Sequence, residues 1–488
     1  MNHIRNAVIP FCVTPSHRLL PAILTTVATV TLVTLGGCAS FSQDGGFDGV
    51  ENIARERLGK DVKWVKSDAD SDTTETRVKE LLAKPLSADD AVQVALLNNK
   101  GLQASFAELG ISEADLVQAG RLPNPRFSML RARDNDDYKI EQTLTFNVFS
   151  LLTMPQASAF ERRRFERTQR AVAQDMLTLA AETRKAYYMA VAADEGVRYM
   201  RQVKGAADAG AELARRMVQA GNWNKLQQAR EQGFYADAAL NLAHAGQAQT
   251  SSREKLIRLM GLWGPQILFT LPERLPDLPK SPHALLNVEQ TAIAQRLDVQ
   301  AARLETEALA KNLGLTRTTR FINALEFGPA RVLEGRQGDP YKRGYEVSFE
   351  LPIFDWGTAR VAKAESIYMQ AINRAAETAI NARSEVREAY QNYRGNYDIA
   401  RHYRDEIVPV RKRIAEENQL RYNGMLIGVF ELLADARSQI TSVNSYIEAL
   451  RDFWLAQADL DMALIGKPTM RAVSGAGLIP AAANGAAH

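Results

Sequence analysis

The sequence predicts a mainly α-helical protein with a smaller β portion suited to a membrane, built from two similar halves. Two stretches, at about 157–220 and about 356–422, have the length and composition of very long helices. Two shorter stretches alternate apolar and polar residues with a period of two, which is typical of strands. Segments of the first half reappear in the same order in the second half. These observations predict duplicated long helical hairpins with strands beside them.

The composition indicates an ordered chain and excludes a nucleic-acid partner. Of the 488 residues, 46% are hydrophobic and 24% are charged. The 60 lysines and arginines nearly balance the 57 acidic residues, for a net charge of +3. A chain without a strong field of one sign lacks the electrostatic footprint of nucleic-acid binding. Basic clusters such as Glu161–Arg167 also contain acids, and we interpret them as solvated helix faces.

The N-terminus predicts a lipoprotein signal peptide over residues 1–37. Basic residues precede an apolar run from Leu19 to Leu35, which ends in Leu-Gly-Gly-Cys. This ending resembles the lipobox of bacterial lipoproteins, in which the cysteine, here Cys38, is acylated and becomes the mature N-terminus. An uncleaved anchor helix is the alternative interpretation. Because Cys12 would leave with the signal, the mature chain could form no internal disulfide. We expect a covalent lipid on Cys38 and no other cofactor.

The rest of the chain divides into two repeats with flanking segments. Gln103 and Gln300 occupy similar segments, as do Ala229-Arg230 and Ala436-Arg437, at nearly the same spacing. Five prolines between the repeats exclude a helix and predict an extended strap. The expected divisions are an acylated N-terminus and polar tether (38–86), the first repeat (87–263), a proline-rich crossing (264–282), the second repeat (283–466) and a flexible tail (467–488).

Each repeat is expected to hold a medium helix, a β-hairpin and a long helical hairpin. The first long helix, at about 157–220, would extend roughly 90 Å, which is too long for an ordinary globular core. The second is interrupted by Pro409, where we expect a kink or a break. Glycine-containing turns at Gln219–Asn224 and Tyr422–Gly428 reverse the chain, because glycine suits the left-handed position that closes a helix. The hairpins are therefore interpreted as coiled coil.

The β-hairpins are predicted over residues 125–149 and 319–352. The segment Tyr138–Phe149 alternates apolar and polar residues, and Gly344–Phe354 repeats this pattern in the second half. Less regular companion strands precede them at Arg126–Arg133 and Arg320–Phe327, with turn-rich segments between. Each chain thus supplies four strands.

The alternation fits either an ordinary soluble sheet or a membrane sheet. Strands of about ten residues can cross a bilayer at a tilt. Four strands cannot close a barrel, and open sheet edges are excluded from lipid. If the strands enter a membrane, several chains must therefore contribute to one barrel, and the sequence predicts an oligomer.

Several motifs carry a resemblance to a known family. They are the lipobox Cys38, the duplicated halves, AGRLPNPRFS (Ala119–Ser128), FELPIFDWG (Phe349–Gly357) and YNGMLIGVFELLADAR (Tyr422–Arg437). In their order along the chain, from about 87 to 466, they resemble the TolC-family outer-membrane factors, particularly the lipid-anchored branch found in tripartite efflux systems.

The resemblance implies a homotrimer, lipid-anchored in the outer membrane and extending into the periplasm. Four strands per chain would form a twelve-stranded barrel, and the hairpins would form an α-barrel. A periplasmic adaptor would dock at the helical tips and connect the duct to an inner-membrane pump of the RND type. Residues implied to face the barrel lumen are Lys139, Glu141, Thr143, Thr145, Asn147, Glu346, Ser348 and Glu350. Those implied to face lipid are Tyr138, Ile140, Leu144, Phe146, Val148, Tyr345, Val347 and Phe349.

The resemblance also assigns the tips and a periplasmic entrance. The implied adaptor-contact residues are Gly221, Asn222, Trp223, Asn224, Gly424, Met425, Leu426, Ile427, Gly428 and Val429. The best-known members carry a ring of aspartates shortly after the second tip. Here Phe430 stands near that place, with Glu431 and Asp435 close by as candidates for the selectivity ring. Three copies of a carboxylate around one lumen favour cations, and which of the two points inward stays open.

No catalytic or metal-binding motif is recognisable, so we expect no enzyme and no dedicated metal site. The chain has no Walker loop, no G-x-S-x-G and no H-E-x-x-H, and its six histidines are scattered. The favoured function is a passive exit duct for efflux. The alternatives are a lipid-anchored coiled-coil scaffold whose strands form a small soluble sheet, or a drug or secretion conduit of the same family. The segment QRLDVQAAR (295–303) and the tip sequence resemble the metal-exporting branch of the family, and this resemblance implies heavy-metal cations as cargo.

Overall fold

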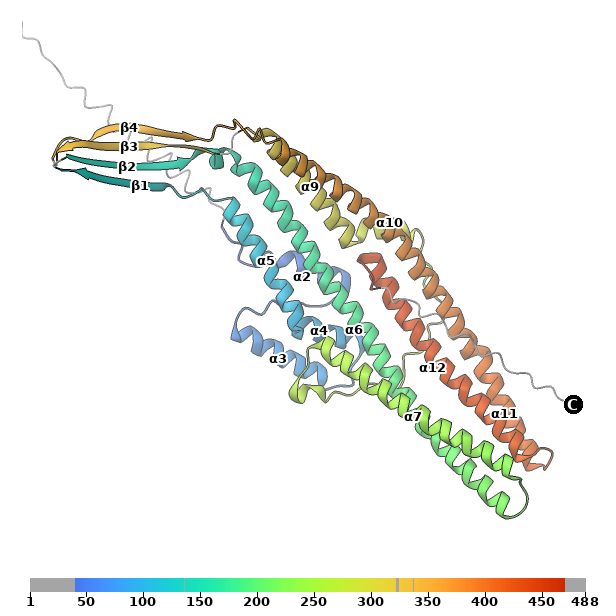
Figure 1. Ribbon diagram of the computed structural model, residues 1–488. Coiled ribbons are helices and arrows are strands. Elements are labelled where there is room, and N and C mark those ends of the chain that lie inside the picture. Colours follow the sequence, from blue (N-terminus) through green and yellow to red (C-terminus); the bar gives the residue numbers. More distant parts are fainter. Residues whose placement is uncertain (1–39, 136, 322–323, 337, 470–488) are drawn as a thin grey trace, which may run out of the picture. The chain divides into compact units, whose positions relative to one another are not determined.

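The computed structural model describes residues 40–135, 137–321, 324–336 and 338–469 (Figure 1). These residues form long helices and one four-stranded sheet, in two compact units. Within the described residues, the sheet unit takes in 40–41, Ala114–Ser158 and Thr319–Trp356. The helical unit comprises Ser42–Glu113, Ala159–Thr318 and 357–469. Among the described residues, no helix combines the length and the hydropathy needed to span a bilayer.

The sheet unit contains the four predicted strands as two hairpins. The order β1-β2-β3-β4 follows the sequence, and each neighbouring pair is antiparallel. β1 and β4 are the edge strands. The strands are β1 (Arg126–Asp134), β2 (Asp137–Asn147), β3 (Leu325–Arg336) and β4 (Lys342–Phe349).

Strand β3 differs from its prediction, which placed this strand at Arg320–Phe327. It begins five residues later and includes Gly328 and Pro329 in the middle of the sheet. Proline cannot donate a hydrogen bond to a neighbouring strand, so the Gly328-Pro329 sequence predicts an interruption of the strand. The ladder with β2 is indeed interrupted there, between the pairs Thr143↔Ala330 and Phe146↔Phe327. Gly328 lies so close to β2 that a Cβ atom would stand 1.8 Å from the carbonyl oxygen of Leu144.

Two predicted strand ends are also wrong. Val148 and Phe149 begin helix α6 instead of ending β2, where the side chain of Asn147 accepts a hydrogen bond from the backbone N–H of Ser150 (2.8 Å). Such a bond caps the first turn of a helix. Glu350 follows β4, which ends at Phe349, just before the Leu351-Pro352 pair.

The expected polar tether is wrong for much of its length, because residues after Ser42 fold in the helical unit. They form α2 (Asp48–Leu58) and α3 (Asp68–Leu82). Phe47, Val50 and Ile53 are buried with Phe106 and other residues in one hydrophobic cluster. These apolar residues recur every three positions and give one narrow buried stripe on an otherwise polar helix.

The medium helix of each repeat is split at an equivalent position. The first splits at Asn99 into α4 (Ala88–Asn98) and α5 (Lys100–Ala119). The second splits at Arg296 into α8 (Val288–Gln295) and α9 (Leu297–Thr318). Both Asn99 and Arg296 have extended backbone angles. Both repeats thus share this split of the medium helix, which the spacing of apolar residues in the sequence does not predict.

The long helices form two antiparallel hairpins. They are α6 (Val148–Gln219) with α7 (Lys225–Met260), and α10 (Thr358–His402) continued by α11 (Val408–Asn423), with α12 (Val429–Ile465). The predicted break at Pro409 is confirmed, because one π-helical turn, η2 (Tyr403–Ile407), separates α10 from α11. α6 begins earlier than predicted and contains Pro155.

The proline-rich crossing is held against the helical unit by polar contacts to its backbone. It begins with one 3-10 turn, η1 (Gly264–Ile267), and has no other helix, as its prolines predict. The buried hydroxyl of Tyr397 on α10 donates to the carbonyl oxygens of Pro279 (3.1 Å) and Lys280 (2.8 Å). The carboxylate of Glu195 on α6 accepts from the N–H of Leu275 (3.2 Å). Helices of both repeats therefore fix the crossing.

Candidate functional site

The sheet has one polar and one largely apolar face, as its alternation predicts. Residues paired directly across antiparallel strands share a face. Phe146 pairs with Phe327, which pairs with Val347, so these side chains lie on the same face. All the predicted lumen residues except Glu350 lie together on the other face: Lys139, Glu141, Thr143, Thr145, Asn147, Glu346 and Ser348.

Charges of both signs alternate along the polar face. The Lys139 ammonium lies 3.7 Å from the Glu141 carboxylate, and the Arg126 guanidinium lies 3.6 Å from that of Glu326. On the apolar face, Phe127, Phe146, Tyr345 and other large side chains are exposed to solvent within one chain. A sheet with one polar face and an uncovered apolar face needs a further apolar partner.

The first hairpin turn is closed by a capping box. The Asn224 side chain accepts from the Gln227 N–H (2.9 Å), and the Gln227 side chain accepts from the Asn224 N–H (3.0 Å). These bonds satisfy N–H groups that a helix start leaves unpaired. Gly221 has a φ of +75°, the left-handed conformation expected of it. The predicted tip residues 221–224 therefore form a defined turn before α7.

The second hairpin turn differs from its prediction in where the left-handed residue lies. Gly424 has a φ of −81°, and Met425 takes the left-handed conformation with a φ of +61°. A methionine in this conformation costs conformational energy that glycine avoids. Met425 is 94% exposed, and Leu426 is exposed beside it. This tip therefore presents apolar side chains to solvent.

The two candidate acidic residues after this tip have different surroundings. Asp435 accepts a hydrogen bond from the side chain of Asn418 on the neighbouring helix α11. Glu431 is exposed in the first turn of α12, and its carboxylate has no hydrogen bond or ion pair within the described part of the chain. The carboxylate of Glu431 is therefore the freer of the two to meet an ion.

An ion pair near the tips that includes a buried carboxylate went unnoticed in the sequence. Glu231 on α7, 1% exposed, accepts a hydrogen bond from Arg437 on α12. The Arg437 guanidinium also lies 4.4 Å from the ring centre of Phe234. Both charged residues lie in the duplicated segments, and this repetition is the one sequence feature that points to them. Their charge on polar helices instead predicted that both side chains would be exposed to solvent.

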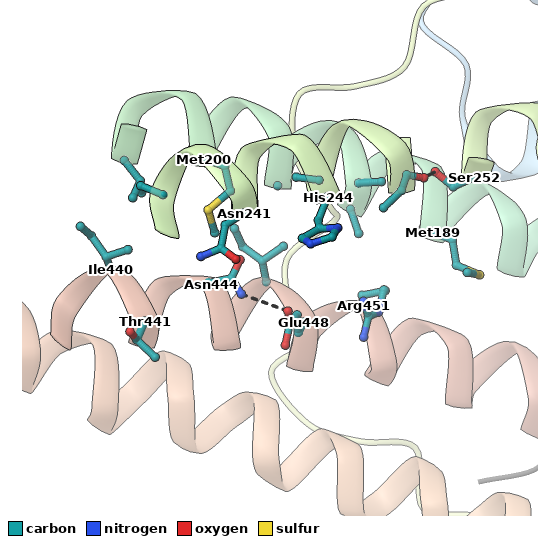
Figure 2. A pocket seen from close by; sticks show the side chains of 18 of the residues that line it. Met189, Met200, Asn241, His244, Ser252, Ile440, Thr441, Asn444, Glu448 and Arg451 are labelled. Carbon is teal, nitrogen blue, oxygen red and sulfur yellow. Dashed lines mark hydrogen bonds between the residues drawn. The ribbon is translucent and has the colours of Figure 1, made fainter. Parts of the chain in front are cut away.

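A cavity of about 600 Å³ lies beside this pair, between α6, α7 and α12. Figure 2 shows His244 of α7 and Glu448 of α12 pointing into it from opposite sides. The Glu448 carboxylate accepts a hydrogen bond from the Asn444 side chain (3.0 Å). Across the residues that the structure covers, no three histidine, cysteine, aspartate or glutamate side chains are grouped as a metal site would require.

Comparisons with known proteins find one relative by sequence and several solved structures of similar fold. No family model matches the chain. The chain is 27% identical over 279 residues to the cobalt-zinc-cadmium resistance protein CzcC of Cupriavidus metallidurans, across 56% of this chain and 64% of that protein. The match thus spans less than two thirds of that relative's length.

Solved structures share the fold over more of the chain. A CusC structure matches with a TM-score of 0.64 at 16% identity, over 78% of this chain and 92% of CusC. The Campylobacter jejuni CmeC outer-membrane channel gives 0.66 at 19%, over 77% and 85%. The open state of the Neisseria gonorrhoeae MtrE outer-membrane channel gives 0.62 at 18%, over 77% and 88%. At these identities the likeness establishes the fold.

Proposed function

We propose that this chain, which has the fold of the TolC-family outer-membrane factors, forms the outer-membrane exit duct of a tripartite efflux system. The observation that carries the proposal is a two-faced sheet joined to long helical hairpins. The exposed apolar face suits lipid, and the charged face suits a water-filled lumen. Conduction through such a duct is passive and needs no catalytic group.

The duct is a homotrimer. A membrane sheet must have no open edge, because an unpaired backbone group in lipid costs several kcal/mol. β1 and β4 are edge strands in one chain, so each must pair with a strand of another copy. Three chains supply twelve strands, which is enough for a closed barrel.

The N-terminus anchors the trimer in the outer membrane. Cys38 lies outside the described residues, and its acylation is supported by the Leu-Gly-Gly-Cys sequence alone. The acyl chains add to the lipid contacts of the strands, and the helical hairpins extend into the periplasm. This arrangement leaves the tips accessible to partners.

The tips are the docking surface for a periplasmic adaptor that connects the duct to an inner-membrane pump of the RND type. Met425 and Leu426 are exposed in the second tip, as is Leu226 just after the first. Exposed apolar side chains at the end of a rigid hairpin are suited to a protein contact. Met425 takes the left-handed conformation in this turn, and its side chain is 94% exposed.

The cargo is a metal cation, with drugs or other solutes as the alternative within the same type of duct. The name of the curated relative refers to resistance to cobalt, zinc and cadmium. Glu431 is the stronger candidate for a selectivity ring, since Asp435 is already engaged by Asn418. Three Glu431 carboxylates around the entrance would favour cations over anions.

A deletion strain tests the function and the cargo together. The strain is challenged with cobalt, zinc and cadmium salts and, separately, with hydrophobic drugs, with and without the restored gene. Metal sensitivity that the gene reverses supports the proposal. Sensitivity to drugs alone contradicts the metal cargo.

The rival scaffold is tested by extraction. A channel yields heat-resistant trimers that only detergent releases from membranes, even when Cys38→Ser removes the acylation site. A scaffold with the same substitution is released into aqueous buffer as a monomer, which would overturn the channel.

A further inference from the structure

The largely apolar face of the sheet carries four arginines. Residues paired directly across antiparallel strands share a face, as do alternate residues of one strand. Tyr138 and Ile140 lie on the same side of β2 as Phe146, and each of them pairs with an arginine of β1. Gln142, also on this side, pairs with an arginine of β3, which itself pairs with an arginine of β4. We name these four residues the arginine patch: Arg131, Arg133, Arg331 and Arg343.

The arginine patch lies towards the end of the sheet at which β1 is joined to β2 and β3 to β4 (Figure 1). Towards the other end the same face is apolar, and Phe127, Phe146 and Val347 are exposed on it. Along β2, Phe146 is separated from Gln142 by roughly 14 Å and from Tyr138 by roughly 27 Å, at 3.4 Å per residue. The face therefore has an apolar part and a cationic part.

No carboxylate neutralises the arginine patch within the described part of the chain. All four side chains are exposed, and the ion pairs of the described strands lie on the polar face. Arg133 donates to the backbone oxygen of Asn135 (2.8 Å), and Arg331 donates to the side-chain oxygen of Gln142 (2.6 Å), both neutral acceptors. The acidic residues of the strands all belong to the polar face: Asp134, Asp137, Glu141, Glu326, Glu334 and Glu346.

The four arginines form two pairs of like charges. Arg331 and Arg343 oppose each other directly across β3 and β4, an arrangement that destabilises a sheet. Arg131 and Arg133 are alternate residues of β1, and their guanidinium groups lie 5.9 Å and 5.2 Å from the centre of the Tyr138 ring. An anion bound at each pair would relieve this repulsion.

The guanidinium groups extend towards the turns of the hairpins. Arg131 reaches the ring of Tyr138, which pairs with Arg133, the residue nearer the turn. The guanidinium of Arg331 lies 5.2 Å from the ring centre of Tyr341, which precedes β4 on the turn side. Long cationic side chains on an apolar surface extend in this way when their charged ends lie in a polar layer beside it.

This combination of charge and apolar surface fits a phosphate-bearing lipid. Guanidinium groups bind phosphate with two parallel hydrogen bonds, and the adjoining apolar part suits acyl chains. A soluble anion would leave the apolar part uncovered. The arginines of β1 are two to three strands away from those of β3 and β4, or roughly 10–14 Å at 4.8 Å per strand. Two separate phosphate groups on one headgroup match two separate pairs of arginines.

We propose that the arginine patch binds a membrane lipid whose headgroup carries two phosphate groups. Arg131 and Arg133 hold one phosphate, Arg331 and Arg343 hold the other, and the acyl chains lie along the apolar part of the same face. This inference rests on the proposed outer-membrane function, because only a sheet that turns this face to lipid presents the patch to headgroups.

Lipid binding to the detergent-solubilised trimer tests the proposal. The protein is titrated with bisphosphorylated lipid A, with the same lipid lacking its phosphates, and with inorganic phosphate as competitor. Native mass spectrometry counts the bound lipid. The control variant removes two cations from the polar face at the same end of the sheet. The arginine variants are Arg131→Gln with Arg133→Gln, and Arg331→Gln with Arg343→Gln, and the control is Arg336→Gln with Lys342→Gln.

Each arginine variant should weaken binding of the bisphosphorylated lipid about tenfold or more, and the control should bind it like wild type. Equal weakening in the control would mean that net charge alone attracts the lipid, which overturns the patch. The wild-type protein tests the occupant without any variant. Equal binding of the lipid without phosphates, or its displacement by millimolar inorganic phosphate, overturns a phosphate-bearing lipid.

Heat-resistant trimers and conductance are measured on the same samples. A conducting trimer that does not bind the bisphosphorylated lipid rejects the arginine patch while keeping the duct. A protein that neither forms trimers nor conducts rejects the proposed function instead.

Discussion

Arg437 on α12, which is partly exposed, and the buried Glu231 on α7 form an ion pair that joins the two helical hairpins near their tips. The pair connects one repeat to the other, because α7 belongs to the first hairpin and α12 to the second. Breaking a buried pair on one side leaves an uncompensated charge, which costs more than losing both members. The pair therefore makes the position of one hairpin depend on the other.

Arg437→Met should lower stability by about 2–4 kcal/mol, because it leaves the Glu231 carboxylate buried without a cation. Glu231→Gln with Arg437→Met should recover part of that loss. The measurement is thermal unfolding of the detergent-solubilised protein for both single variants and the double variant. Strictly additive effects would show that the two residues are not coupled.

Gly328→Ala should prevent the sheet from forming, because its Cβ would stand 1.8 Å from the carbonyl oxygen of Leu144. The loss is read as the disappearance of heat-resistant trimers on a gel. Gly344→Ala in β4 is the matched control, since a Cβ there meets nothing within 4 Å. Equal trimer yields for both variants would contradict the close approach of β3 to β2.

Tyr397→Phe should destabilise the helical unit by about 1–3 kcal/mol, because the carbonyl groups of Pro279 and Lys280 lose their common donor. The crossing should also become more sensitive to proteolysis. Tyr390→Phe, on the same helix, is the control, because the structure assigns the Tyr390 hydroxyl no hydrogen bond within the described residues. A proteolysis rate unchanged from wild type would argue against this anchoring of the crossing.

Glu195 should make stability depend on pH. Burial raises the pKa of this carboxyl, and the hydrogen bond from Leu275 N–H opposes the rise only in part. A raised folded-state pKa means that the folded protein binds the proton more tightly, so stability falls as pH rises from the ordinary value of 4.5 through the raised pKa.

Glu195→Gln keeps an acceptor for Leu275 and removes this buried charge. Its melting temperature should exceed that of wild type at pH 7, and the difference should shrink towards pH 4. The exposed Glu273 supplies the control Glu273→Gln, which should show no such trend. A difference that stays constant from pH 4 to pH 8 would contradict the role given to Glu195.

Glu431→Gln should reduce cation selectivity more than Asp435→Asn, because the Asp435 carboxylate is occupied by Asn418. Reversal potentials under a salt gradient across a planar bilayer report the selectivity of each variant. If both variants keep the wild-type reversal potential, neither residue lines the entrance. If Asp435→Asn has the larger effect, the assignment of Glu431 is wrong.

Periodicity predicted the regular elements and failed where few residues determined the structure. The unbroken alternation in 138–147 located β2, whereas Gly328-Pro329 concealed the middle of β3. Residues 48–58 were expected to be a tether because a single narrow stripe of apolar side chains carries α2. The break between α10 and α11 follows from the restricted backbone of Pro409, so the sequence alone predicted it.

The candidate site was only partly predictable for a related reason. The polar face of the sheet follows from a two-residue period, which any strand must obey. The Glu231–Arg437 pair depends on how separate helices pack, and no local pattern records it. Met425 takes the left-handed position although glycines lie one residue before and three after it, so the exposed tip side chains emerge only from the folded turn.

Single-channel recording tests the proposed duct most directly. The purified acylated protein, shown to be trimeric in detergent, is added to a planar lipid bilayer of outer-membrane composition. A trimeric duct predicts discrete, cation-selective conductance steps that disappear with Gly328→Ala and persist with Gly344→Ala. A trimer that enters the bilayer without conductance in any buffer, or a protein that stays monomeric, would contradict it.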